Sequence, residues 1–431
     1  MSDFSSVLDD LVTHEPSVLV MGGGHVGLSF ALLLAHHSIK STVIEKRRYP
    51  TLTPTADTER DQYLDSRNTA LSRRTVQIYG EIGLWQTLET NACRIDTVEI
   101  YEKNSFGCAT LRKEEEGVES FGYVMENAHL GYALLQAVKE SPLIQLLDGA
   151  SVTNLSQDET AAHLTIEHEG QCFSLSAPLV VACDGQDSIA RAALGVTAHH
   201  HDYGQTAIVG VVKTDKPHAH TAVECFSPLG PLALLPLKTS ASGVGGLAGV
   251  GEGSYRSVVW ICKTGEEARY LTDEAYFLSA LKETFGTLAG NITQAGKRGA
   301  YPLVKVLADK QVVGRCVLMG NAAHTLHPVA GQGFNLCMRD ADTLSSMLAD
   351  YVKAEKPLDA PEFLASGLLS AYETRRLKDQ KRVIFFCDGV VNGFTSKNVV
   401  VKLARNLGLL IFDKVPFVKP MVARFAMGLK S

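Results

Sequence analysis

The chain has 431 residues, of which 45% are hydrophobic and 20% charged, the balance of a globular protein with two or three joined domains. This composition excludes a disordered chain, a collagen-like repeat and a small disulfide-held scaffold. The net charge of −6 lacks the basic excess that nucleic-acid binding requires, so no nucleic-acid partner is expected.

The cysteines and the start of the chain favour a reducing, cytoplasmic setting. Nine cysteines are spread singly from Cys93 to Cys387 without a CxxC pair, which predicts neither a disulfide framework nor a thiol-bound metal. The three histidines at 199–201 cannot share one face of a regular element, so no metal site is predicted there. We expect no signal peptide and no membrane-spanning helix.

The first 45 residues predict a strand, a helix and a second strand. The apolar run 17–21 ends in glycines and is typical of a buried strand, 28–37 has the length of a helix, and 41–45 is a second short strand. This order favours a parallel sheet with helices on its faces. The polar, proline-containing stretch 49–67 is interpreted as a loop.

The later elements alternate between strands and helices before a β-rich stretch. Four β-like runs between 203 and 265 indicate a second, mainly antiparallel domain. The remaining expected elements are strands at 97–101, at 151–177 (as a hairpin), at 179–182 and at 312–319, and helices at 75–88, at 129–140 and from 360 onward.

A GxGxxG motif follows the first strand. Gly22 permits a tight turn, Gly24 lets the backbone approach a pyrophosphate, and Gly27 lets helix and strand pack closely. The helix that follows offers free N–H groups and the positive end of its dipole. Glu45, at the end of the second strand, can accept hydrogen bonds from ribose hydroxyls. These residues predict a site for FAD or a nicotinamide dinucleotide.

A second motif, Asp184 with Gly185, follows the strand 179–182. It places polar groups at the carboxyl end of a strand, where α/β sheets bind ligands. The alternative is an ordinary helix N-cap formed by Asp187 or Ser188.

The third motif is the segment 320–340, GNAAHTLHPVAGQGFNLCMRD, which follows the strand 312–319. Its glycines expose backbone N–H groups at a helix start, which can hold negative charge on a reduced flavin ring. The alternative is a glycine-rich turn before a buried helix. The residues expected to face a flat ligand are Pro328, Gly331, Gly333, Phe334 and Asn335.

These three motifs in this order resemble the class A flavoprotein monooxygenases, which have the para-hydroxybenzoate hydroxylase fold. Over nearly its whole length the sequence is similar to the bacterial ubiquinone-biosynthesis hydroxylases. The segments that carry this similarity are Arg67 with 70–72 (ALS), 122–127 (GYVMEN), 202–207 (DYGQTA), 230–236 (GPLALLP) and 327–335 (HPVAGQGFN).

The resemblance implies an α/β architecture with a Rossmann-type FAD domain and an interleaved antiparallel-sheet substrate domain. The implied boundaries are 14–75, 125–195 and 300–355 for the FAD domain, 76–124 and 196–299 for the substrate domain, and 356–431 for a C-terminal helical region.

The resemblance also assigns roles around FAD. The ADP half would be bound by Gly22, Gly24, Gly27 and Glu45, with Arg47 near the adenosine. Asp184, Gly185 and Asn321 would lie near the pyrophosphate and ribityl chain, and 331–335 would face the flavin ring. The family usually has an acid where Asn321 stands. Hydroxylases of 2-octaprenyl-6-methoxyphenol also carry GNAA, so the resemblance points to that branch.

The implied reaction is hydroxylation of a polyprenylated phenol with molecular oxygen, through a flavin C4a-hydroperoxide and with NAD(P)H as electron donor. His327 and Tyr203 are candidates for handling the phenol proton; the alternative for both is a buried side chain with satisfied hydrogen bonds. Other hypotheses are another ring position, a soluble aromatic substrate, a flavin-dependent reductase or oxidase of the same fold, and a flavoprotein assembly subunit.

The C-terminal region is basic. Residues 375–431 contain 12 Lys or Arg against 3 Asp or Glu, and the apolar segment 399–412 is interrupted by Lys402 and Arg405. This pattern predicts a helix lying in a membrane interface or docking on other ubiquinone-pathway proteins. We therefore expect a cytoplasmic protein held peripherally at the inner face of the bacterial membrane. The alternative is packing against the FAD domain.

Overall fold

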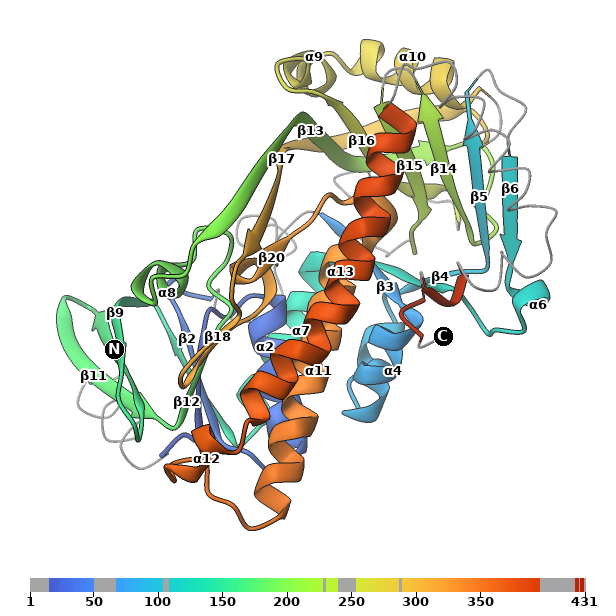
Figure 1. Ribbon diagram of the computed structural model, residues 1–431. Coiled ribbons are helices and arrows are strands. Elements are labelled where there is room, and N and C mark those ends of the chain that lie inside the picture. The colour runs from blue at the N-terminus through green and yellow to red at the C-terminus, as the bar shows by residue number, and fades with distance from the viewer. Residues whose placement is uncertain are drawn as a thin grey trace.

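The computed structural model describes residues 15–49, 67–103, 108–227, 230–238, 253–286, 289–395, 423–425 and 427–429. Two large sheets lie at opposite ends of the molecule, and long helices run between them (Figure 1). The predicted interfacial segment 399–412 and most of the predicted loop 49–67 lie outside the described residues.

The first sheet has six strands in the order β18-β19-β12-β1-β2-β8 and is parallel except for the β18–β19 pair. All four residues of β1 are buried, since this central strand is covered on both faces. The strand bounds are β1 (Val18–Met21), β2 (Ser41–Glu45), β8 (Ile144–Asp148), β12 (Leu179–Ala182), β18 (Val312–Val313) and β19 (Cys316–Leu318).

Helices pack on one face of this sheet, and a small sheet, β11-β10-β9, packs on the other through Leu155, Leu164 and Ile166. The helical side is a single apolar core that includes Phe30 and Leu344. The elements are α2 (His25–His36), α7 (Asn127–Glu140), α11 (Gln332–Lys353), α12 (Glu362–Ala365) and α13 (Leu368–Thr395), with β9 (Ala150–Gln157), β10 (Ala162–His168), β11 (Gln171–Ala177) and α8 (Ile189–Ala193) on the other side.

The second sheet has eight strands in the order β20-β17-β13-β16-β15-β14-β5-β6, and only its β14–β5 pair is parallel. Helices α9 (Glu267–Thr272) and α10 (Glu274–Phe285) cover its outer face, where Trp260 and Phe277 pack (Figure 1). The strand bounds are β5 (Thr97–Glu102), β6 (Cys108–Arg112), β13 (Ala198–Thr214), β14 (Thr221–Ser227), β15 (Gly230–Pro236), β16 (Tyr255–Lys263), β17 (Ile292–Ala308) and β20 (His324–Thr325).

A third, three-stranded sheet, β3-β7-β4, lies between the two large ones. From its strand β3, Asn68 Nδ2 donates to Ser257 Oγ of β16 at 3.1 Å, which fixes β3 against the inner face of the eight-stranded sheet. The elements here are β3 (Asn68–Ser72), β4 (Cys93–Ile95), β7 (Gly122–Glu126), α4 (Arg73–Glu81), α5 (Trp85–Glu89) and α6 (Lys113–Glu116).

Several predicted elements are confirmed, and three differ. The expected helix at 75–88 is two helices, α4 and α5, separated at Gly83 with φ +75°. The expected strand at 312–319 reverses at Gly314, with φ +56°, into the β18–β19 pair. The expected hairpin at 151–177 has a third strand. Glycine at a left-handed position breaks the first two elements where apolar content predicts continuity.

The division into domains stays a prediction. Its boundary at residue 300 falls inside β17, which belongs to the eight-stranded sheet from Ile292 to Ala308. Within the described part of the chain, no helix combines the length and the apolar character needed to cross a bilayer.

Candidate functional site

The glycine loop after β1 forms an open cradle at the start of α2. Gly22 has φ +96°, and a Cβ added there would lie 2.5 Å from the Cys183 carbonyl oxygen. A Cβ at Gly27 would lie 1.9 Å from the Gly22 carbonyl oxygen, so loop and helix meet backbone to backbone. A Cβ at Gly24 would enter open space, and no side chain caps α2. The first N–H groups of α2 therefore face a space that a pyrophosphate can fill.

Glu45 is fixed beside this cradle at the end of β2. Its Oε2 accepts the Gly23 N–H at 2.7 Å, and its Oε1 accepts the Arg47 N–H at 2.9 Å. Tyr49 donates its hydroxyl to the Gly23 carbonyl at 2.5 Å. Each Glu45 oxygen keeps a further lone pair for a ribose hydroxyl. The Arg47 side chain is exposed at the rim of the loop, and its contact with an adenosine stays a prediction.

Asp184 follows β12, next to the glycine loop in the same parallel sheet. Its Oδ2 accepts the Ala190 N–H at 3.0 Å, whereas Oδ1 is buried with no hydrogen-bond partner among the described residues. Burying a hydrogen-bond acceptor without a donor costs free energy of folding, unless a bound ligand supplies the donor. The predicted N-cap also forms, because Ser188 Oγ accepts the Arg191 N–H at 2.9 Å. The N-cap alternative is thus confirmed at Ser188, and ligand binding by Asp184 stays a prediction.

The third motif reaches the same edge of the sheet. Gly320 has φ +66°, and a Cβ there would lie 3.4 Å from Val26 Cγ1 in the first turn of α2. Asn321 is exposed in the short 3-10 helix Gly320–Ala322. The open space at Gly24 and the orphaned Asp184 oxygen thus lie at neighbouring strand ends, and together they fit a dinucleotide with hydroxyl donors and a pyrophosphate.

The loop before α11 is held by Asn335. Its Oδ1 accepts from the Ser72 N–H and the Thr75 hydroxyl, and its Nδ2 donates to the carbonyls of Ala70 and Gly331, all at 2.8 Å. With four bonds to protein, this amide positions the loop and has no group left for a ligand. Gly333 is open, since a Cβ there would meet nothing within 4 Å.

Phe334 joins this loop to the glycine cradle. Its ring meets the ring of His25 edge to face, with centroids 6.2 Å apart. Pro328, which is half-buried, begins the 3-10 turn Val329–Gly331 that precedes α11. The direct contacts of these loop residues with a flavin stay predictions, but the structure brings both ends of the predicted FAD site together.

His327 and Tyr203 lie together beneath α13. His327 accepts the Val329 N–H on Nδ1 at 3.2 Å, and its Nε2 lies 3.2 Å from Gln205 Oε1. Burial lowers the pKa of His327 to about 4, so the ring is neutral. The Tyr203 hydroxyl donates to Asp388 at 3.1 Å, and burial raises its pKa. Both side chains are engaged by protein groups, which favours positioning over proton transfer.

The inner face of the eight-stranded sheet carries a carboxylate that the sequence analysis missed. Val223 and Cys225 of β14 pack under α10, so Glu224 between them points to the opposite face, the one that Ser257 shares with β3. Burial raises the pKa of Glu224. Side chains in the segment 221–227 alternate between the two faces of the sheet. This alternation predicts the direction of Glu224 only when it is known that Val223 and Cys225 lie in the outer core.

A buried charged network behind the third motif was also missed. Asp340 of α11 accepts from His324 Nε2 at 2.6 Å and from Arg376 Nε of α13 at 2.5 Å. Burial alone raises the pKa of Asp340, but Arg376 and His324 outweigh it and hold the pKa below its usual value. Gln380 Nε2 adds a bond at 3.1 Å. The network joins β20, α11 and α13, which lie far apart in the sequence.

Comparisons with known proteins place this geometry in a family. Residues 15–386 match the family described as FAD binding domain. The chain is 31% identical over 413 residues to the ubiquinone hydroxylase UbiL of Rhodospirillum rubrum, covering 95% of this chain and 89% of that protein. It is 28% identical over 426 residues to the 3-demethoxyubiquinol 3-hydroxylase of Escherichia coli, covering 97% and 100%.

Among solved structures, the p-nitrophenol 4-monooxygenase PnpA of Pseudomonas putida DLL-E4 shares the fold, with a TM-score of 0.74, 17% identity and coverage of 97% of this chain and 99% of that one. The predicted α/β fold of the para-hydroxybenzoate hydroxylase type and the FAD cofactor are thereby confirmed. This chain belongs to the FAD binding domain family, among the FAD-dependent monooxygenases that include the ubiquinone hydroxylases.

Proposed function

We propose that this protein hydroxylates the ring of a polyprenylated phenol in ubiquinone biosynthesis, with 2-polyprenyl-6-methoxyphenol as its substrate. The observation that carries the proposal is the inner face of the eight-stranded sheet, which is apolar at Ala207 and Ile261, carries the carboxylate of Glu224 and faces the flavin-site loops. Asn321 in the GNAA segment supports this substrate, because the resemblance associates GNAA with that branch.

Hydrogen bonds that link the eight-stranded sheet to the flavin-site loops support a substrate position between them. Ser257 on the inner face holds Asn68 at 3.1 Å, and β3 continues to Ala70, which Asn335 holds at 2.8 Å. Arg67, which precedes Asn68, lies over the ring of Tyr301, with its Cζ 4.9 Å from the ring centroid. A flat phenol between these layers would meet apolar side chains that exclude water, including those of Ala207, Val209, Val259 and Ile261.

Each set of residues has a distinct part in the reaction. The start of α2 at Gly24 binds the pyrophosphate, and Glu45 and Asp184 accept hydrogen bonds from FAD hydroxyls. FAD, when bound, supplies the oxygen-activating chemistry. One oxygen atom of O₂ enters the ring, the other leaves as water, and NAD(P)H supplies the two electrons. Glu224 accepts the proton of the phenol hydroxyl, since its raised pKa makes it a stronger base than an exposed carboxylate.

A second candidate is hydroxylation at another ring position. The Escherichia coli relative is named 3-demethoxyubiquinol 3-hydroxylase and is matched over its full length. The second candidate is therefore hydroxylation of a demethoxyubiquinol, a substrate of the same class, at its 3-position.

We also propose peripheral binding at the inner face of the membrane. On α13 the side chain of Phe385 is 81% exposed, and Lys378, Lys381 and Arg382 are exposed near it. An exposed aromatic ring with basic neighbours suits a surface of anionic lipid, where an insoluble polyprenyl substrate resides.

The test is lipid analysis of a strain that lacks this protein, before and after complementation. Accumulated polyprenyl-methoxyphenol that disappears on complementation supports the proposed substrate. Accumulated demethoxyubiquinol supports the second candidate, and an intact quinone pool contradicts both.

A further inference from the structure

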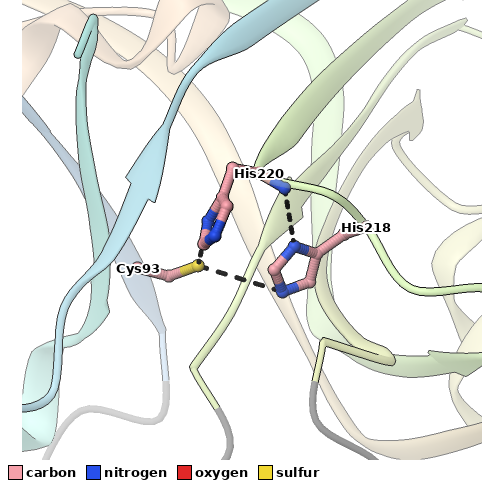
Figure 2. Close-up of side chains that lie close together, drawn as sticks. All are labelled: Cys93, His218 and His220. Carbon is pink, nitrogen blue, oxygen red and sulfur yellow. Dashed lines mark hydrogen bonds between the residues drawn. The ribbon is translucent and has the colours of Figure 1, made fainter. Parts of the chain in front are cut away.

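Three metal-binding side chains meet at the seam between the three-stranded and eight-stranded sheets. Cys93 begins β4, and His218 and His220 lie in the turn between β13 and β14 (Figure 2). Cys93 Sγ lies 3.9 Å from His218 Nε2 and 3.7 Å from His220 Nδ1, and the three ligand atoms lie within 4.8 Å of one another. Cys93 and His218 are 125 residues apart in the chain, so the spacing of these residues in the sequence does not predict the cluster.

We propose that Cys93, His218 and His220 form a binding site for zinc. A thiolate and two imidazoles are a ligand set that zinc prefers. Bonds of ~2.3 Å to sulfur and ~2.0 Å to nitrogen in tetrahedral geometry separate the sulfur and each nitrogen by about 3.5 Å. The two sulfur–nitrogen separations exceed this by only a few tenths of an ångström. The three ligand atoms lie within 4.8 Å of one another, whereas two zinc-bound nitrogens are about 3.3 Å apart, so zinc binding draws the histidine rings together.

The turn that carries the histidines is held in an unusual conformation. Ala219 and His220 have left-handed φ values of +46° and +57°, which are uncommon for residues other than glycine. The His220 carbonyl accepts the Asp96 N–H at 2.9 Å, which fastens the turn to the segment after β4. Both rings point toward Cys93 (Figure 2), with their centroids 5.5 Å apart. The backbone thus presents the ligands before any metal arrives.

Zinc replaces existing hydrogen bonds at His218. Nδ1 of this ring accepts the His220 N–H at 3.0 Å, and Nε2 lies 3.1 Å from the Leu237 carbonyl oxygen, so without metal the proton is on Nε2. When Nε2 binds zinc, that proton moves to Nδ1, the His220 N–H loses its acceptor, and the turn shifts. The Cys93 proton leaves to solvent, and the freed Leu237 carbonyl or a water completes four-coordination.

The bound metal would join three segments: β4, the 218–220 turn and Leu237, the residue that follows β15. Glu224 lies in β14, four residues after His220, so the site would also stabilise the strand that carries the proposed base. This assigns the metal a structural part, separate from the flavin site.

The experiment is a zinc titration of the FAD-loaded protein after chelator treatment, followed by isothermal calorimetry and thermal denaturation. We expect one equivalent to bind and the Tm to rise. Cobalt(II) should then give tetrahedral absorption bands at wavelengths longer than those of the flavin, and hydrogen exchange should change at 218–221. Cys93→Ser and His220→Ala should each weaken zinc binding more than about tenfold without loss of flavin.

Matched controls remove a cysteine and a histidine elsewhere. Cys108→Ser alters an exposed side chain of β6, and His163→Ala alters a half-buried side chain of β10; neither residue belongs to the cluster, so both variants should keep zinc binding unchanged. Absence of a one-equivalent binding event, or equal affinity in wild type and in both site variants, would overturn the proposal. Because flavin content is measured in the same samples, failure of this site leaves the hydroxylase proposal standing.

Discussion

Asn335 and Ala70 are joined by a 2.8 Å hydrogen bond between segments 265 residues apart in the chain. The same Asn335 amide binds Ser72, Thr75 and Gly331, so it fixes β3 and the start of α11 as one unit. Through Asn68, which bonds Ser257, this unit connects the inner face of the eight-stranded sheet to the predicted flavin-ring loop 331–335. Its rigidity therefore sets how substrate and flavin face each other.

Asn335→Ala should loosen both the fold and the flavin site. The change leaves the buried Ser72 N–H and the Thr75 hydroxyl without their acceptor, which costs roughly 2–4 kcal/mol. We expect a lower Tm and weaker FAD retention, measured by denaturation and by flavin absorbance per protein. Asn154→Ala, at an exposed position of β9, is the control. Equal Tm values for the two variants would show that the four hydrogen bonds of Asn335 do not stabilise the protein.

Gly24 and Gly27 should respond differently to substitution. Gly24→Asp places its side chain in open space, so the protein should fold, but the charge occupies the pyrophosphate path and FAD is lost. Gly27→Ala forces a Cβ to within 1.9 Å of the Gly22 carbonyl oxygen and should lower the Tm. Flavin content and circular dichroism separate the two effects. A yellow Gly24→Asp protein with full flavin content would refute the cradle.

Glu224→Gln should lower hydroxylated product per NAD(P)H consumed, because the phenol loses its proton acceptor. The same variant should be more thermostable than wild type at neutral pH. Burial raises the pKa of Glu224, so the charged form is the destabilising one, and this penalty disappears as the pH falls below that pKa. The difference in Tm should therefore vanish in acid. An unchanged yield of hydroxylated product per NAD(P)H in Glu224→Gln would show that Glu224 is not the proton acceptor.

Tyr203→Phe tests positioning against proton transfer. Asp388 keeps its 2.7 Å bond from Lys305, so we expect a loss of only about 1 kcal/mol and an unchanged pH–rate profile. Disappearance of one limb of that profile would instead restore Tyr203 as a catalytic acid or base.

Phe385→Ser should reduce cosedimentation with vesicles of anionic lipid. The side chain is 81% exposed, so the fold should be unaffected. Val352→Ser, at an exposed apolar position of α11 (39% exposed), is the matched control. Undiminished binding of the Phe385 variant would count against a membrane role for this face of α13.

The dinucleotide end of the site could be predicted because its signals are local. Gly22, Gly24, Gly27 and Glu45 lie within 24 consecutive residues. Backbone geometry requires glycine at 22 and 27, whereas Gly24 leaves open the space predicted for the pyrophosphate. Their assembly against Asp184 follows from the parallel pairing of β1 with β12.

The substrate side could not be predicted because strand pairing creates it. Asn68 and Ser257 are 189 residues apart in the sequence. The role proposed for Glu224 depends on the face of the sheet to which β14 directs its side chain. The Asp340–Arg376 pair likewise depends on how α11 and α13 pack, which residue types alone do not reveal.

The most direct test supplies the purified, FAD-loaded protein with a polyprenyl-methoxyphenol, NAD(P)H and isotope-labelled oxygen gas, followed by mass spectrometry of the lipid. The account predicts a ring-hydroxylated product that carries one labelled oxygen atom. A product without label, or reduction of the substrate without oxygen incorporation, would contradict it and favour a flavin-dependent reductase or oxidase of the same fold.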